Sequence, residues 1–390
     1  MVTKDHDDPI YHNVQQYQRT IQQKPSLGEE FEFGIHKPSS ERVILTLIDF
    51  LMQSPSTTSL DLHTMCNDCY PDDEQVFNHL FEKLKDKMRS RWKELKEFST
   101  KFEWFHSIPL PPDHGPWDVK ICFSYGCILV TDFYTFGIRV FDLVSKEFKT
   151  TIALPACPTC VCVEEPLRVT SDSTALIFGC SKPKVAVYKY EMRKLLNARR
   201  TPTTRNACNE SPIWKTTDFK WPYGIAIWRS ENQVFVCDVD TKSVKILNSQ
   251  SGLLLTSIQL QFRCCSVDLA SDRELVVSAG NQLFIFKQSL SGEWEQYKNF
   301  SRLGSEEGSL DGPFSLVVDK KTKNIMVSDC NNHRINVFTL EGEFVKSFGS
   351  RVNTTPTNEY FCFPRGICLN DRTGDLLVAD RDSFRIQFFK

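Results

Sequence analysis

The residues best suited to hold a metal ion in the first hundred residues are cysteines and histidines. Cys66 and Cys69 form a lone CxxC pair, and His63 and His79 would be the two further ligands. A tetrahedral zinc site needs four ligands, which usually come from two such pairs. We therefore interpret the pair as ordinary surface cysteines on a helix and expect no zinc.

A denser group of thiols is formed by Cys157, Cys160 and Cys162, with no histidine nearby. We place this group in a loop between two of the repeats defined below. In a loop, such thiols could bind a metal or respond to oxidants, whereas in a folded core they are small buried side chains. We favour the second interpretation, and we expect no metal and no other cofactor.

Four aspartates recur at one place in a longer pattern, each 16 residues after a proline. The pairs are Pro116 and Asp132, Pro222 and Asp238, Pro313 and Asp329, and Pro364 and Asp380. An aspartate at the end of a strand can accept hydrogen bonds from backbone N–H groups of the following turn. We therefore assign these carboxylates a structural role and not a catalytic one.

The prolines and aspartates mark the strands of a repeat. A proline opens the first strand, the aspartate closes the second, a run of the Arg-Ile-x-Val type forms the third, and a trailing segment forms the fourth. Two degenerate copies without aspartate fill the gaps, so that repeats begin at 116, 166, 222, 264, 313 and 364. Four antiparallel strands repeated radially are typical of a β-propeller blade. We predict a mainly β protein with a six-bladed propeller over residues 101–390.

The last repeat lacks a fourth strand of its own, because the sequence stops at Lys390 after the third. Residues 102–110 are similar to the fourth strands of other repeats, such as residues 148–154 and 253–260. We predict that this early segment completes the final blade and closes the ring, since full closure removes sheet edges.

The composition indicates a folded protein without a dominant charge. The chain is 41% hydrophobic, contains 29 Phe and 15 Cys, and has a net charge of −2. Residues 101–390 carry 35 Lys and Arg against 32 Asp and Glu, which is a weak electrostatic signature for nucleic acid. The N-terminus has no apolar signal region, and no run approaches the roughly 18 apolar residues of a membrane span. We predict a cytoplasmic protein with free thiols and no membrane partner.

The fifth repeat contains Asp329-Cys-Asn-Asn-His-Arg-Ile-Asn-Val-Phe338, and the sixth opens with Pro364-Arg-Gly-Ile367. These runs resemble the NHL repeat, and the resemblance extends over about 290 residues. WD40 and kelch propellers fit less well, because no Trp-Asp terminus or Gly-Gly doublet marks the repeats. Blades two and four depart from the NHL pattern, because both lack the aspartate.

The resemblance also implies two enzyme classes as alternatives, which are zinc lyases of hydroxyglycine peptides and calcium-dependent lactone hydrolases. The lyases line their channel with histidines, whereas this propeller holds only His106, His114 and His333. Three metal-binding histidines cannot be assembled at the channel from this set. We therefore predict that the protein is not an enzyme, with a propeller hydrolase or lyase as a remaining alternative.

The first hundred residues differ in character from the repeats. Residues 1–38 are polar, and we predict that they are disordered. Residues 39–100 show helical spacing of apolar residues, including a stripe from Phe77 to Phe98, and we predict a small helical region. It is either a cap packed on the propeller or a divergent domain that resembles an F-box. The F-box resemblance implies a ubiquitin-ligase adaptor as a partner of these helices.

The residue after each start proline should lie near the central axis, where the innermost strand enters its blade. These positions hold Trp117, Leu167, Tyr223, Cys265, Phe314 and Arg365. Turns between the second and third strands should add further groups on the same face. Rings and guanidinium groups around one rim suit a peptide or a stacked base, unless the rings simply pack between blades. The predicted partner-binding set is Trp117, Tyr134, Tyr223, Phe314, Arg334, Arg365, Arg381 and Arg385.

Together these features favour a non-enzymatic interaction scaffold that binds a protein or peptide through this face. One alternative is a substrate-recognition subunit in ubiquitin ligation, and NHL proteins are often tied to ubiquitination through a RING that this chain lacks. Another is single-stranded RNA binding, which the NHL resemblance also implies. The basic segment from Lys189 to Arg205 does not change this order, because we interpret it as a solvated insertion of the second repeat.

Overall fold

The computed structural model describes residues 95–165, 174–181, 183–197, 210–350 and 360–390. The predicted disordered segment 1–38 lies outside the described residues, as does the predicted helical region 39–100 up to residue 94. The F-box-like resemblance and the CxxC pair of Cys66 and Cys69 also lie there. Among the described residues, no helix is long and apolar enough to cross a membrane.

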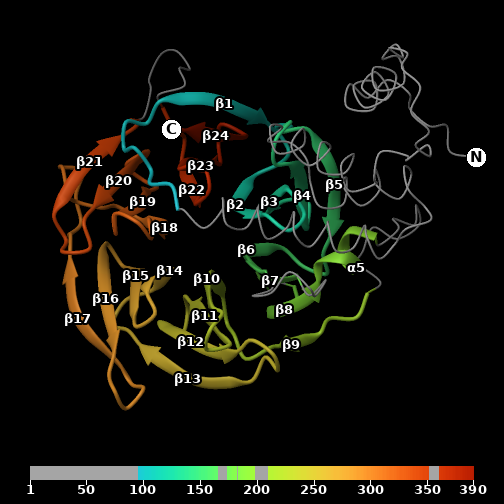
Figure 1. Cartoon of the computed structure of the whole chain (residues 1–390), viewed down its shortest axis with the longest axis horizontal. Coiled ribbons are helices and arrows are strands. Elements are labelled where there is room, and N and C mark those ends of the chain that lie inside the picture. The colour runs from blue at the N-terminus through green and yellow to red at the C-terminus, as the bar shows by residue number, and fades with distance from the viewer. Residues whose placement is uncertain (1–94, 166–173, 182, 198–209, 351–359) are drawn as a thin grey trace, which may run out of the picture. The chain divides into compact units, whose positions relative to one another are not determined.

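The described chain forms six four-stranded antiparallel sheets arranged as the blades of a propeller around a central axis (Figure 1). Blade one comprises β2 (Pro116–Cys122), β3 (Cys127–Asp132), β4 (Gly137–Asp142) and β5 (Phe148–Ala153). Blade two comprises β6 (Pro158–Glu164), β7 (Ala175–Cys180), β8 (Ala186–Glu191) and β9 (Trp214–Thr216). Blade three comprises β10 (Pro222–Trp228), β11 (Gln233–Asp238), β12 (Ser243–Asn248) and β13 (Leu254–Gln259). Blade four comprises β14 (Cys264–Ser271), β15 (Glu274–Ala279), β16 (Gln282–Gln288) and β17 (Trp294–Phe300). Blade five comprises β18 (Pro313–Val318), β19 (Ile325–Asp329), β20 (Arg334–Phe338) and β21 (Phe344–Phe348). Blade six comprises β22 (Pro364–Asn370), β23 (Asp375–Asp380), β24 (Arg385–Phe389) and β1 (Trp104–Pro109). A short helix, α5 (Met192–Asn197), follows β8. The predicted mainly β fold with a six-bladed propeller is confirmed.

The proline and aspartate pattern sets the register of the two innermost strands. In four blades the start proline lies directly opposite the aspartate that ends the next strand, as with Pro116 and Asp132 or Pro364 and Asp380. A constant spacing of 16 residues therefore corresponds to a hairpin of constant length. Both residues lie at one end of the blade, which we call the top face.

Blade two begins earlier than predicted. Its innermost strand is β6, which starts at Pro158 and pairs that residue with Cys180, so the predicted start at Pro166 is wrong. The sequence missed this strand because its run of cysteines and threonine carries no aspartate partner and no glycine. The predicted loop around Cys157 to Cys162 is consequently mostly strand.

The ring closes as predicted. β1, from the beginning of the described chain, pairs antiparallel with β24 at the end of it, with Ile108 opposite Ile386. Figure 1 shows the two strands side by side as the outer part of blade six. Without β1, the backbone groups along β24 would form an open sheet edge.

Residues 95–100 form no helix, which corrects the end of the predicted helical stripe. This segment instead runs across the end of the propeller opposite the top face, where the backbone N–H of Lys96 donates to the carbonyl of Asp371. Phe98 is buried between blades five and six, where its ring packs edge-on against Phe102. The ordered part of the propeller therefore begins before residue 101.

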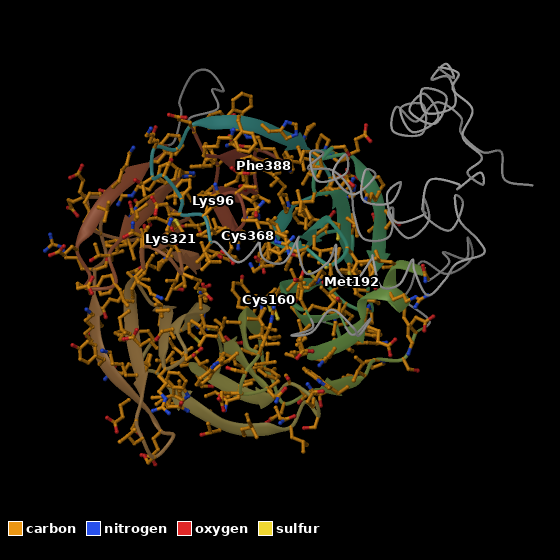
Figure 2. All side chains as sticks on the ribbon, viewed as in Figure 1. Lys96, Cys160, Met192, Lys321, Cys368 and Phe388 are labelled. Atoms are coloured by element: carbon orange, nitrogen blue, oxygen red, sulfur yellow. The ribbon has the colours of Figure 1, made fainter. Side chains whose placement is uncertain are left out.

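The core lies between the blades. The buried side chains of the described residues form six clusters, and each joins two neighbouring blades. Figure 2 shows Phe388 within blade six and Cys160 and Cys368 close to the middle of the ring. Each sheet is thus apolar on both faces, as stacked blades require.

The six innermost strands meet tightly around the axis. A Cβ atom added to Gly366 in blade six would lie 2.4 Å from the Cα of Asp118 in blade one, and one added to Gly224 in blade three would lie 2.4 Å from the Cα of Ser266 in blade four. Both glycines stand two positions after their start proline, so the glycine of the repeat pattern makes room for the neighbouring strand.

Hydrogen bonds tie the same strands together from blade to blade. The carboxylate of Asp118 accepts from the N–H of Val161 at 3.0 Å, which joins blade one to blade two. The hydroxyl of Ser315 accepts from the N–H of Ile367 at 3.3 Å, which joins blade five to blade six. Bonds of this kind join neighbouring blades close to the axis.

Substituting Ile108 by Ala tests whether β1 closes the ring. Ile108 is buried against blades one and six, so the substitution should lower the free energy of unfolding by about 2–5 kcal/mol. Urea unfolding measures this change. The exposed Glu103→Ala serves as control and should stay within about 0.5 kcal/mol of the wild type; equal stability of the two variants would contradict closure by β1.

Substituting Gly366 by Ala tests the close approach of the strands. The added methyl group must displace the backbone of blade one, so we expect a loss of about 1–3 kcal/mol, visible as a lower melting temperature. The exposed Glu295→Ala on β17 controls for surface effects. A melt of Gly366→Ala that matches the control would show that the axis is looser than described.

Candidate functional site

The innermost strands are irregular just after they begin. In all six blades the pairing with the second strand slips directly after the first residue, as between Pro116 and Val119. Such bulges redirect side chains, and here they bring the residue after the start proline toward the axis. In blade two this residue is Thr159 and not Leu167, because the strand begins at Pro158.

Four of the predicted residues meet at the axis. The ring of Trp117 packs edge-on against Tyr223, with centroids 6.0 Å apart, and against Phe314 at 5.5 Å. Tyr223 and Phe314 lie 5.0 Å apart. The guanidinium of Arg365 stacks 3.7 Å from the centroid of Trp117 and 4.3 Å from that of Phe314. Residues from blades one, three, five and six thus form one cluster, which no single repeat contains.

The cluster continues outward as a strip of aromatic rings. Trp117 stacks on Phe133 at 4.2 Å, Phe133 contacts Tyr134 at 5.9 Å, and on the other side Tyr223 contacts Trp221 at 5.8 Å. We call Tyr134, Phe133, Trp117, Tyr223 and Trp221 the aromatic strip. Trp117 is 5% exposed, while Tyr134 and Trp221 at the two ends are 52% and 36% exposed.

The rings of the rim differ in their exposure, so the packing interpretation applies to some of them and not to others. Trp117 is a packing residue, because it is buried under its neighbours. Tyr134 and Trp221 are accessible from solvent. Sequence reasoning missed Trp221 and also Phe262, which is 45% exposed and packs near Gly280 in the turn after β15. A useful signal was present, since both are aromatic residues within two positions before an innermost strand.

Arg334 and Arg385 have structural partners. Arg334 donates from Nε to Asp329 at 2.8 Å and from its other nitrogens to the backbone carbonyls of Ser305, Glu306 and Ser309. Arg385 donates to Asp380 at 2.9 Å and to the carbonyl of Tyr360. A partner would have to displace these bonds, so we leave both arginines out of the proposed binding surface.

The repeated aspartates hold two kinds of loop. In blade one, Asp132 accepts from the N–H groups of Tyr134 and Thr135 in the following turn, as predicted. In blades five and six, Asp329 and Asp380 accept instead from Asp311 and Cys362, in the loops that precede the innermost strands. Burial raises the pKa of both carboxyl groups. The predicted structural role of the aspartates is confirmed. The prediction named only the turn that follows each aspartate, whereas in blades five and six the carboxylate holds the loop that precedes the innermost strand.

In blades five and six an arginine contacts the repeated aspartate directly, whereas in blade one a histidine lies between the aspartate and an arginine. His114 contacts the carboxylate of Asp132, and its ring nitrogens lie 3.2 Å from a guanidinium nitrogen of Arg139. Arg139 occupies the place along its strand that Lys245 holds in blade three, where Lys245 pairs with Asp238 at 3.1 Å. The side chain beside the aspartate thus differs from blade to blade.

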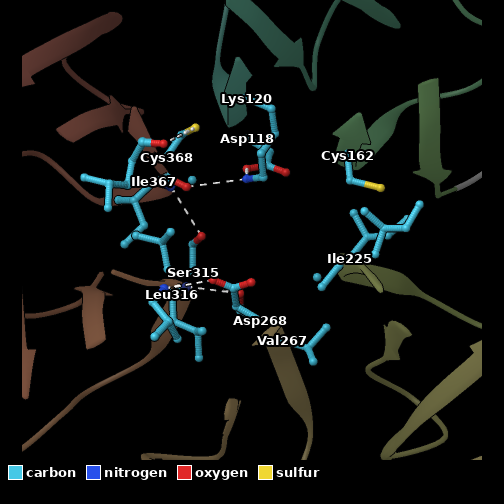
Figure 3. Close-up of a pocket in the computed structure, with 18 of the residues that line it drawn as sticks. Asp118, Lys120, Cys162, Ile225, Val267, Asp268, Ser315, Leu316, Ile367 and Cys368 are labelled. Atoms are coloured by element: carbon cyan, nitrogen blue, oxygen red, sulfur yellow. Dashed lines mark hydrogen bonds and ion pairs between the residues drawn. The ribbon is translucent and has the colours of Figure 1, made fainter. Parts of the chain in front are cut away.

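Below the cluster lies a cavity of about 240 Å³, lined by the innermost strands. Two ion pairs face it, Lys120 with Asp118 at 2.8 Å and Lys320 with Asp268 at 2.9 Å. Figure 3 shows Lys120, Asp118 and Asp268 around this cavity. Both carboxylates also accept backbone N–H groups of a neighbouring blade. The charges of the cavity are therefore largely committed to joining blades, and Tyr223 and Phe314 are among the lining residues.

The thiols of the predicted loop are core residues. Cys160 and Cys162 belong to β6, and Cys157, Cys160 and Cys162 are all buried. Burial raises the pKa of Cys157 and of Cys162 to about 12. Within the described ranges, no group of three or more His, Cys, Asp or Glu side chains is placed to hold a metal ion.

The predicted basic insertion begins later than expected. Lys189 lies in β8, where it is buried, pairs with Glu164 and donates to the carbonyl of Ser249 at 2.9 Å. The insertion separates the third and fourth strands of blade two and includes α5. Its residues 198–209 lie outside the described residues.

Reactivity of the thiols tests their burial. A raised pKa leaves less reactive thiolate at any given pH, so Cys162, Cys265 and Cys368, each with a pKa near 12, should be alkylated by iodoacetamide at pH 8 far more slowly in the native protein than in urea. Mass spectrometry of the labelled peptides measures each site. Labelling of Cys162 in the native protein at the unfolded rate would restore the accessible-loop interpretation.

Comparison with known proteins gives a consistent result for the last blade and the fold. The family model described as NHL repeat matches residues 361–389. Protein brain tumor of Drosophila melanogaster is 30% identical over 91 residues, which are 23% of this chain and 8% of that protein. Rat peptidylglycine alpha-amidating monooxygenase is 34% identical over 90 residues, 22% of this chain and 9% of that protein. The chain thus spans less than a tenth of these relatives.

Among solved structures, an auxiliary nutrient binding protein from Bacteroides thetaiotaomicron superposes with a TM-score of 0.55 at 13% identity, covering 76% of this chain and 75% of that one. At such identity the likeness concerns the fold alone. Together with the six observed blades and their Pro–Asp register, these findings show a six-bladed β-propeller whose last blade matches the NHL repeat.

Proposed function

We propose that the protein is a non-enzymatic interaction module that binds a peptide segment of a partner protein across its top face. The observation that carries this proposal is the aromatic strip, which runs without interruption from Tyr134 through the buried Trp117 to Trp221. Buried aromatic anchors flanked by accessible rings are typical of the energetic centres of protein interfaces.

The exposure of the rings supports the same conclusion. Tyr134, Trp221 and Phe262 place large apolar surfaces in solvent at the loops of one face. None of these three rings belongs to the six clusters of buried side chains between the blades, so packing of the core does not explain their presence. Exposed apolar groups gathered at one place mark interaction sites more often than isolated ones do.

The remaining hypotheses have less support from the described residues. RNA binding would favour a strongly basic top face, whereas Arg334 and Arg385 are paired with aspartates. A hydrolase or lyase would use the cavity, whose Asp118 and Asp268 are engaged with lysines and backbone groups. A ubiquitin-ligase adaptor would bind the N-terminal residues, which lie outside the described part.

The triple variant Tyr134→Ala, Trp221→Ala and Phe262→Ala tests the proposal. These side chains are accessible, so we expect each substitution to change the free energy of unfolding by no more than about 0.5–1 kcal/mol while partner binding is lost. Tyr297→Ala on the outer strand β17 is the matched control, because Tyr297 is exposed far from the axis.

The measurement is affinity purification of full-length protein from cell lysate, with and without RNase, followed by mass spectrometry. Proteins that are retained by the wild type and the control and lost by the triple variant would support the proposal. Retention of the same proteins by the triple variant would place the binding surface elsewhere, and loss of all partners after RNase treatment would favour RNA.

A further inference from the structure

Arg365 differs from the other three arginines of the predicted partner-binding set in having no acidic partner among the described residues. Arg334 and Arg385 pair with the aspartates of their own blades, and Arg381 lies 3.2 Å from Asp382. No carboxylate of the described residues lies within ion-pair distance of Arg365. Its charge is therefore not neutralised by the part of the fold that the structure describes.

The aromatic rings around Arg365 hold its guanidinium in place but do not accept hydrogen bonds from its Nε. It stacks on Trp117 and Phe314, and the ring of Tyr223 packs against both of these rings. Its Nε and the indole Nε1 of Trp117 are both buried and have no hydrogen-bond partner among the described residues. Burial lowers the pKa of Arg365 from its usual value, which is the expected effect on a cation removed from water without a counter-charge.

The free donors suit a planar anion. A guanidinium presents its nitrogens in a rigid fork that matches a carboxylate, and stacking on aromatic rings leaves the edge of the fork available. Arg365 is partly exposed while its Nε is buried, so a carboxylate would approach the terminal nitrogens of the fork and supply the missing counter-charge. The position at the centre of the aromatic strip would let residues flanking the carboxylate pack on the rings.

The charge balance favours one carboxylate over a polyanion. Arg381 is the nearest other guanidinium, 5.6 Å from the centroid of Trp117, and Asp382 already neutralises it. A nucleic-acid strand gains affinity from several phosphate contacts, and this centre offers one unpaired guanidinium. A peptide with a single acidic group needs no more than that.

We propose that Arg365 receives one carboxylate of a bound peptide, either an Asp or Glu side chain or the C-terminal carboxylate, at the centre of the aromatic strip. This inference rests on the proposed function and adds the chemical class of the partner. Arg365 is a recognition residue here, while Trp117, Phe314 and Tyr223 position its guanidinium.

The test uses the full-length chain and a random dodecapeptide library. Selected peptides are synthesised with a free or an amidated C-terminus, and with each Asp or Glu replaced by Asn or Gln, and their affinities are measured by fluorescence anisotropy. The protein variants are Arg365→Met, which keeps an unbranched side chain against the rings, and Arg273→Met, a matched exposed arginine in the turn between β14 and β15. Melting curves verify that both variants fold.

We expect the selected peptides to share one carboxylate whose replacement by an amide weakens binding to the wild type and to Arg273→Met by about ten-fold or more. Against Arg365→Met, the acid and amide forms should bind equally, because the partner of the carboxylate is gone. Comparison of free and amidated C-termini identifies which kind of carboxylate is bound.

Other outcomes separate the two proposals. Peptides that lose binding with Tyr134→Ala and yet show no preference for a carboxylate would overturn the role of Arg365 while leaving peptide binding intact. If no peptide binds, both proposals are wrong, and oligouridine binding that weakens with salt would then point to RNA. Should Arg365→Met fail to fold, Arg365→Lys with the same peptides still tests whether the planar fork is required.

Discussion

The close approach of six innermost strands around one axis is the constraint on which the rest of the structure depends. Where Gly366 and Gly224 face a neighbouring backbone, a methyl group would already collide. At the other contacts, polar side chains such as Asp118 and Ser315 accept N–H groups from the next blade. A strand at the axis is thus held on one side by its own sheet and on the other by the next blade, which explains why charged residues occur in an otherwise compact centre.

The same crowding produces the candidate binding surface. Because each innermost strand bulges after its first residue, the next side chain is directed to the axis, and side chains from four blades meet there. Large rings and one guanidinium fill the space, so the top face has an aromatic centre while the cavity below it is charged. The apolar strip and the ion-paired cavity are therefore two consequences of one geometry, separated by Tyr223 and Phe314.

The loops of the top face are organised by the repeated aspartates. Each carboxylate is buried beside the start proline of its blade and holds a turn or an entering loop through backbone N–H groups. Arg334 and Lys245 on the third strands pair with the aspartates of blades five and three. In blade one, His114 precedes the innermost strand and lies between Asp132 and Arg139. Arg365 stands outside this system, which is the physical reason for giving it, and not Arg334 or Arg385, a role in recognition.

The sequence by itself determined the number of blades, the hairpin register and the closure by β1, because the Pro–Asp spacing and the strand patterns are local properties that repeat along the chain. It misplaced the start of blade two, where Pro158 lacks an aspartate partner, and it treated the thiols of β6 as part of a loop. It also grouped eight partner-binding residues by type and approximate position. Only the tertiary structure decided that Trp117 is buried, that Arg334 and Arg385 are paired, and that Trp221 and Phe262 are exposed. The same holds for Arg365, which has no counter-charge among the described residues. These properties depend on contacts between blades far apart in the chain, and no local pattern encodes which side chains will meet across the axis.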